Sequence, residues 1–235
     1  MRFLFAALLA ACAAAPASPS HKRSSSYQDL LSLFAEWRAF QRPRVAQGVP
    51  DYTAAAMEAQ HRELAGWMRR LESFDASSWT IAQQNDVQLV RAEMNGLDFD
   101  HRVLRPWARS PAFYATLFDE ESDQPAREGP QSLGSVELWK YSFPLAAAQA
   151  AELAAGLQPI PALLEQARGN LTGDGRDLWI FGIERVKEQR AMLAGLSGKV
   201  AGQAELAAAV KRAQQATDDF IRWLEQKAPS KSGPS

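Results

Sequence analysis

Apolar residues recur at intervals of three and four along most of the chain, which is the spacing of one face of an α-helix. The pattern predicts helices over residues 27–41, 51–74, 79–104, 160–171, 177–196 and 203–227, with a further helix opened by Pro144. In the third of these segments the apolar seam consists of Val87, Val90, Met94, Leu97, His101 and Leu104. No segment alternates apolar and polar residues with strand composition. We therefore predict an all-α bundle of six to seven helices.

The residues between these segments supply helix boundaries. Asp51 is predicted to be the N-cap of the second helix, and Ser110-Pro111 to begin a short helix, because Ser is a preferred N-cap and Pro suits the first helical position. Residues 119–135 contain an acidic cluster with Pro and Gly, which indicates a surface loop.

The first 26 residues have the pattern of an export signal rather than of a folded element. An apolar run over residues 3–11 is too short to span a bilayer, which needs about 20 residues, but suits a signal peptide. It leads directly into Cys12, the only cysteine, in a context that resembles a bacterial lipobox. We predict a lipoprotein signal at 1–11, lipidation of Cys12 and a flexible tether at 12–26. The alternative is an ordinary signal peptide cleaved near Ala17, which would leave a secreted or periplasmic soluble protein.

The rest of the chain divides into an all-α domain at 27–228 and a Pro/Ser/Gly-rich segment at 229–235. We interpret this last segment as a flexible tail or as a junction at which the chain is truncated.

The net charge and the numbers of Cys and His residues exclude several classes of function. Lys and Arg total 26 against 27 Asp and Glu, for a net charge of −1, so the chain has no bulk electrostatic reason to bind nucleic acid. One Cys and three His exclude a disulfide framework and a Cys-rich zinc module. The sequence contains no HExxH, Walker, GxGxxG or GxSxG motif, so it offers no catalytic residues.

Two pairs of a carboxylate and a histidine, each at positions i and i+3, are candidate metal ligands. They are Glu58 with His61 and Asp98 with His101. Helix-bundle dinuclear sites use Glu-x-x-His from two helices and a Glu from each of two more, a role that Glu93 and Glu184 would fill. The stronger interpretation is that His101 is a hydrogen-bonded core residue of the apolar seam and that His61 lies on an exposed face. Three aromatic residues outside the long helices, Trp107, Trp139 and Tyr141, either line a groove or cover the ends of the bundle.

Three passages carry a resemblance to a known bacterial family. They are DVQLVRAEMNGLDF at 86–99, RPWARSPAFY at 105–114 and IPALLEQARGNL at 160–171. Their order over residues 27–235 resembles the N-terminal half of domain of unknown function 885. Members of that family look like secreted or lipid-anchored, mostly helical, zinc-metallopeptidase-like proteins. The resemblance implies that the zinc-binding HExxH helix belongs to a later region, so no zinc ligand or catalytic residue carries over to this chain.

The leading hypothesis is therefore an exported, lipid-anchored helical half of a metallopeptidase-like protein, inactive alone. Its partners would be the membrane, through the lipid, and a missing C-terminal catalytic half; zinc is implied only for full-length relatives. One alternative is a stand-alone lipoprotein scaffold that binds a peptide or protein partner, with residues 119–141 as the first candidate groove. Another is the dinuclear metal bundle. The first hypothesis interprets the chain as truncated, and the second as a natural stand-alone domain.

Overall fold

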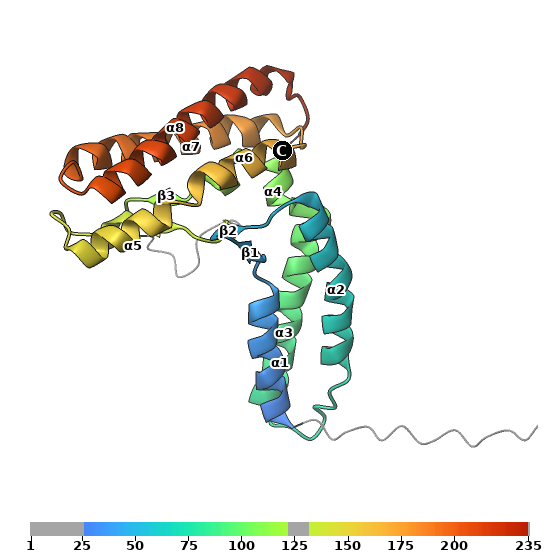
Figure 1. Cartoon of the computed structure of the whole chain (residues 1–235). Helices are drawn as coiled ribbons and strands as arrows, with labels where there is room; N and C mark the ends of the chain where they lie inside the picture. The colour runs from blue at the N-terminus through green and yellow to red at the C-terminus, as the bar shows by residue number, and fades with distance from the viewer. Residues whose placement is uncertain (1–25, 122–131, 235) are drawn as a thin grey trace, which may run out of the picture.

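The computed structural model describes residues 26–121 and 132–234, and this part of the chain is mainly helical (Figure 1). The all-α prediction is confirmed. The residues predicted to form the signal peptide, Cys12 and most of the predicted tether lie outside the described residues. The helices form two groups at an angle to one another, each around its own cluster of buried apolar side chains. We call the group formed by the first three helices the arm and the group formed by the last four the body.

The arm contains α1 (Tyr27–Phe40), α2 (Ala54–Glu72) and α3 (Ile81–Phe99). Its core consists of Leu30, Leu33, Trp37, Leu64, Leu71, Val87, Val90 and Met94, which are residues of the predicted stripes. Each helix begins at a hydroxyl cap, and Ser26 and Thr80 form complete capping boxes.

The cap of α2 differs from the prediction. Thr53, rather than Asp51, accepts a hydrogen bond from the third backbone N–H of the helix, that of Ala56. Asp51 instead accepts hydrogen bonds from the backbone N–H and hydroxyl of Thr53. Asp51 therefore orients the capping residue Thr53 and does not itself bond to the helix.

The last turn of the predicted third helix changes type. Residues Asp100–Leu104 form a π-helix, which closes with a hydrogen bond from the Arg105 N–H to the Asp100 carbonyl oxygen at 2.7 Å. Arg105 then adopts a left-handed conformation with φ of 43°, unusual for a residue other than glycine. The chain turns here from the arm into the body, through α4 (Pro106–Arg109) and a 3₁₀ helix, η2 (Pro111–Tyr114).

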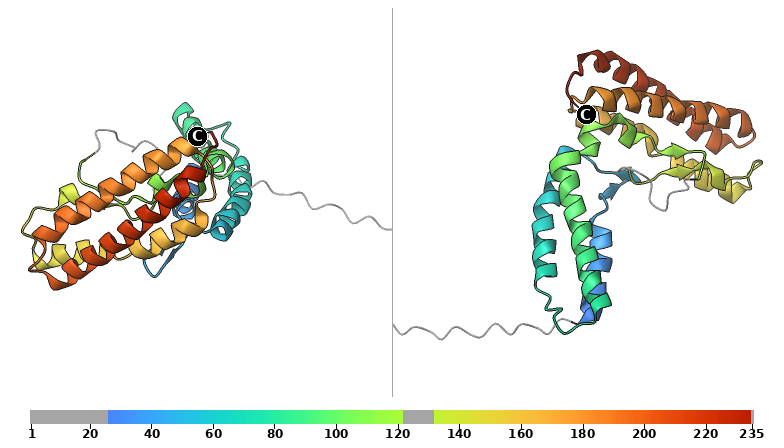
Figure 2. Two further views of the ribbon diagram at one scale, coloured as in Figure 1. Left: turned by 90° about the horizontal axis from the view of Figure 1, so that it is seen from above. Right: turned by 180° about the vertical axis from the view of Figure 1, so that it is seen from behind.

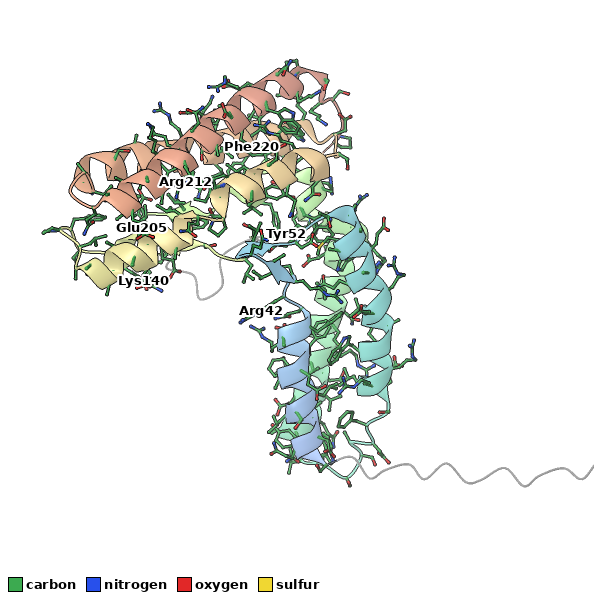
Figure 3. The ribbon with its side chains drawn as sticks, in the orientation of Figure 1. Arg42, Tyr52, Lys140, Glu205, Arg212 and Phe220 are labelled. Carbon is green, nitrogen blue, oxygen red and sulfur yellow. The ribbon has the colours of Figure 1, made fainter. Side chains whose placement is uncertain are left out.

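The body contains α5 (Ala147–Leu157), α6 (Ile160–Asn170), α7 (Arg176–Lys199) and α8 (Ala204–Lys227). α8 packs against the other three, and it buries the stripe Leu206, Val210, Ala213, Thr217, Phe220 and Leu224. Phe220 lies in the interior of this group (Figure 3). η2 lies directly on α7, where a Cβ on Gly182 would come within 2.8 Å of the Ala112 backbone nitrogen, so only glycine fits.

Two pairs of very short strands complete the described elements. β1 (Val45–Ala46) pairs antiparallel with β2 (Val49–Pro50), with Val45 opposite Pro50. β3 (Leu117–Phe118) pairs in parallel with β4 (Val136–Glu137), with Leu117 opposite Val136, and a short 3₁₀ helix, η3 (Leu138–Lys140), follows. These pairs tie connecting segments together and leave the helical class unchanged.

Three local predictions are corrected. The helix after Phe143 begins at Ala147, not at Pro144, because Phe143 and Pro144 form a bend and Ala146, the N-cap, is still extended. Ser110 makes no side-chain cap hydrogen bond, and the turn after it is 3₁₀ rather than α. The described part of the 229–235 segment is bound to the body, since Gly233 pairs with Gly175 and the Lys231 ammonium donates to the Gly173 carbonyl oxygen at 2.8 Å.

Polar contacts fasten the arm to the body. The Gln166 side chain on α6 accepts a hydrogen bond from the Tyr52 N–H at 2.7 Å and donates to the Pro50 carbonyl oxygen. The Tyr52 hydroxyl accepts from the Leu133 N–H at 2.6 Å. Tyr52 therefore lies where arm and body meet (Figure 3).

Candidate functional site

The junction between arm and body gathers the two histidines that the sequence singled out. α2 supplies His61, α3 supplies Asp98, and the π-helix supplies His101. The His61 Nε2 lies 2.9 Å from an Asp98 oxygen, and the Arg102 guanidinium donates to the other oxygen at 2.6 Å. The hydrogen bond with His61, reinforced by Arg102, lowers the pKa of Asp98. The Asp98 carboxylate therefore holds both His61 and Arg102 in place.

His101 is a buried, neutral member of the same cluster. Its ring stacks on that of His61, with centroids 5.0 Å apart, and also packs against Trp107 at 4.9 Å. The Gln60 amide nitrogen donates to two carbonyl oxygens at the end of α1, so its oxygen is the acceptor for the His101 Nε2–H at 2.9 Å. Burial, with a smaller effect of nearby His61, lowers the pKa of His101 to about 4. The arrangement is that of a hydrogen-bonded core histidine.

This environment predicts a pH-dependent loss of stability. The pKa of His101 is 6.5 when unperturbed and about 4 in the fold. Between these values the unfolded chain binds more protons, so stability falls as the pH drops from 6.5 to 4, by about 3 kcal/mol from this residue. Chemical denaturation at pH 7 and at pH 4.5 gives the free energy of unfolding at each pH, and the difference between the two is the predicted loss.

His101→Leu should remove most of this difference. Burial raises the pKa of Asp100, which opposes the effect of His101 because the folded state then holds the Asp100 proton more tightly than the unfolded chain. The comparison between wild type and variant separates the two residues. An equal loss of stability in His101→Leu would contradict the assignment.

The dinuclear metal hypothesis lacks a gathered ligand set. Glu58 is exposed and pairs with Arg62 on its own helix. Glu93 pairs with Arg38, and Glu184 with Lys187. Only His61, Asp98 and His101 come together, and within residues 26–121 and 132–234 no three His, Cys, Asp or Glu side chains are placed to hold a metal ion.

A groove of about 1010 Å³ begins beside this cluster and follows α1 and α3 along the arm. We call it the arm groove. The view from behind shows α1 and α3 side by side below the body (Figure 2). Its lining is mainly apolar: Tyr27, Leu30, Leu31, Phe34, Tyr52, Met57, Leu89, Val90, Leu97, Pro106, Trp107, Phe113 and Leu133. Leu31 and Leu89 are 41% and 64% exposed, so apolar surface faces solvent along its length.

Three carboxylates also line the arm groove. Asp86 accepts a hydrogen bond from the Tyr27 hydroxyl at 2.6 Å, and Glu93 pairs with Arg38 at 3.4 Å. The Asp100 carboxylate, at the end nearest the body, makes no side-chain hydrogen bond or ion pair with the described residues. Burial raises the pKa of Asp100. A half-buried acid therefore faces the groove without a basic partner.

Two of the three aromatic residues predicted to line a groove or cover the bundle ends line different hollows. Trp107 lines the arm groove, whereas Tyr141 lines a separate hollow of about 1060 Å³ on the body, with Phe118, Phe143, Arg185 and acidic residues 119–121. Trp139 is half-buried and lies on η3. The sequence reasoning missed Leu31, Leu89 and Asp100, although the two leucines stand outside the apolar stripes and so carried a signal.

Comparisons with known proteins bear on the fold. No protein-family model matches the chain, and no curated protein matches it significantly. Among solved structures, it is similar to one described as "a putative lipoprotein of unknown function" from Shewanella oneidensis, with a TM-score of 0.60 at 16% sequence identity. The match covers 87% of this chain but 38% of that chain, so the chain spans well under half the length of the protein that it matches. At this identity the likeness shows a shared fold.

None of the described helices is both long enough and apolar enough to cross a membrane.

Proposed function

We propose that this chain is an exported, lipid-anchored helical domain that serves as the N-terminal half of a larger metallopeptidase-like protein, and that it supplies no catalytic residue itself. The observation that carries the proposal is the combination of Cys12 at a lipobox-like position with a fold similar to that of a described lipoprotein. Because the matching chain is much longer, the fold also occurs as one part of a larger polypeptide.

The family resemblance supplies the more specific part of the proposal. The three ordered passages that resemble domain of unknown function 885 imply that zinc chemistry belongs to a later region of the full-length relatives. The arm and body would then form part of the wall of a substrate channel. This part is contradicted if the purified chain alone hydrolyses peptides in a chelator-sensitive way.

Lipidation is the direct test. We expect the chain with its own leader, expressed in a Gram-negative host, to lose residues 1–11 and to carry a diacylglycerol thioether on Cys12, detectable by mass spectrometry. It should sediment with membranes and be released by detergent, because acyl chains hold a protein on a bilayer at about 0.8 kcal/mol per buried methylene.

A matched pair of variants makes the test specific. Cys12→Ala should abolish the lipid mass and the membrane fraction, whereas Ser18→Ala, in the same tether, should change neither. A soluble wild-type product cleaved near Ala17 with a free Cys12 thiol would overturn the anchor and establish ordinary secretion instead.

The arm groove also favours a second candidate, a stand-alone scaffold that binds a peptide or protein partner. Binding of a dye that fluoresces on exposed apolar surface distinguishes the half of a larger protein from the stand-alone scaffold. A half of a larger protein should bind the dye strongly and tend to aggregate, whereas a stand-alone scaffold should be monodisperse.

A further inference from the structure

The arm groove has the dimensions of a site for another helix. Its lining runs from Asp86 on α3 to Asp100, the first residue of the π-helix, which at about 1.5 Å per residue is about 21 Å, or about four helical turns. Exposed Leu31 on α1 and Leu89 on α3 lie among its lining residues, and both are far more exposed than Leu30, which is 1% exposed in the arm core. Surface leucines of this kind beside a large hollow are typical of an interface.

The lining decides between a helix and an extended peptide. An extended segment would have to hydrogen-bond its backbone to the groove. Most of the lining, however, belongs to α1, α2 and α3, whose backbone groups are paired within the helices, and the lining is mainly apolar. Unpaired backbone groups placed there would be costly. A helix satisfies its own backbone and needs only to offer apolar side chains, so the lining favours a helix.

The charged residues of the groove lining indicate which charge the docked helix carries. Of the charged residues in the lining, Asp86 and Glu93 have partners within the arm, whereas Asp100 and Arg42 have none among the described residues. Arg42 follows the end of α1 and Asp100 follows the end of α3. Asp100 lies in the groove with the aromatic rings of Trp107 and Phe113. A lysine or arginine that reached this end would pair with the carboxylate and pack its methylene groups against the rings.

We propose that the arm groove docks an amphipathic helix of the polypeptide that completes the protein, and that a lysine or arginine on this helix pairs with Asp100. The inference rests on the proposed function, in which the chain is one part of a larger protein. It adds the surface, the form of the partner and the charge that the partner must carry.

The test uses the purified, processed chain and synthetic 15-residue helical probes, measured by fluorescence anisotropy. All probes carry leucines at i, i+4, i+7 and i+11 and differ at a single terminal position, which is lysine, norleucine or glutamate; each is made with that position at either end. We expect the lysine probe to bind about tenfold more tightly than norleucine, with glutamate the weakest.

Variants locate the binding. Asp100→Asn keeps the shape of the side chain and should reduce the preference for lysine to below twofold. Leu89→Asp should weaken every probe at least tenfold, whereas Phe181→Asp, at an exposed apolar residue of α7 outside the groove, should have no effect. Circular dichroism confirms that each variant is folded.

Three results would overturn the proposal. One is binding that does not distinguish lysine from glutamate; another is binding that survives Leu89→Asp. The third is a dimer of the chain itself that Leu89→Asp dissociates, which would assign the groove to a second copy. Lipidation of Cys12 without helix binding would remove this inference alone, and helix binding without lipidation would remove only the anchor.

Discussion

Trp37→Ala should lower the free energy of unfolding of the arm by about 3–5 kcal/mol, the usual cost of removing a fully buried tryptophan. The Trp37 side chain is 0% exposed and packs against Phe40 and Trp67, with ring centroids 5.6 and 6.2 Å away. Truncation leaves a large cavity at the centre of the arm core, which has few other residues to fill it.

Hydrogen exchange gives the measurement and its internal control. Because the arm and the body have separate cores, the loss of protection should be confined to α1, α2 and α3, while α5–α8 remain protected. Trp37→Phe should cost much less, since it keeps a ring and removes an indole N–H that has no partner among the described residues. Equal loss of protection in both groups would show instead that arm and body unfold as one unit.

Gln189→Leu should destabilise the body by about 2–4 kcal/mol although it places an apolar residue in an apolar core. Gln189 is 0% exposed, and its side-chain oxygen accepts hydrogen bonds from the Thr116 and Leu117 backbone N–H groups at 2.7 and 3.3 Å. Its amide nitrogen donates to the Thr217 hydroxyl on α8. Leucine has a similar volume but leaves these backbone donors unpaired.

Denaturant unfolding measures this loss, and Gln215→Leu on the exposed face of α8 is the matched control, expected to change stability by less than about 0.5 kcal/mol. A neutral Gln189→Leu would mean that water replaces the lost hydrogen bonds and that Gln189 does not hold β3 against α7.

The helices were predictable because each depends on residues close together in sequence. The predicted stripe of α8 coincides with buried residues, and those of the first and third helices do so for most of their length, since a helix needs one apolar face wherever it packs. Leu104, at the end of the predicted third stripe, is exposed. Errors arose where a local signal competed with a contact made at a distance. Pro144 and Ser110 carry helix-start signals, but Leu145 is buried in the body core and Pro111 packs against Gly182 of α7.

For the candidate site too, the sequence predicted the local features but not the contacts between distant residues. The apolar seam predicted that His101 is a hydrogen-bonded core residue, but nothing in the sequence identified Gln60 as its partner. That pairing depends on α2 and α3 lying side by side and on the π-helix that sets the direction of His101.

Sequence alone predicts the helical class, which the structure confirms, and most of the apolar stripes that form the two cores, because periodicity and composition act over a few turns of chain. Only the tertiary structure divides those residues between an arm and a body, separates Trp107 from Tyr141, and brings α1 and α3 together around a groove with Asp100 at its end. The physical reason is that each depends on the angle at which the chain turns at Arg105 and on contacts between residues far apart in sequence.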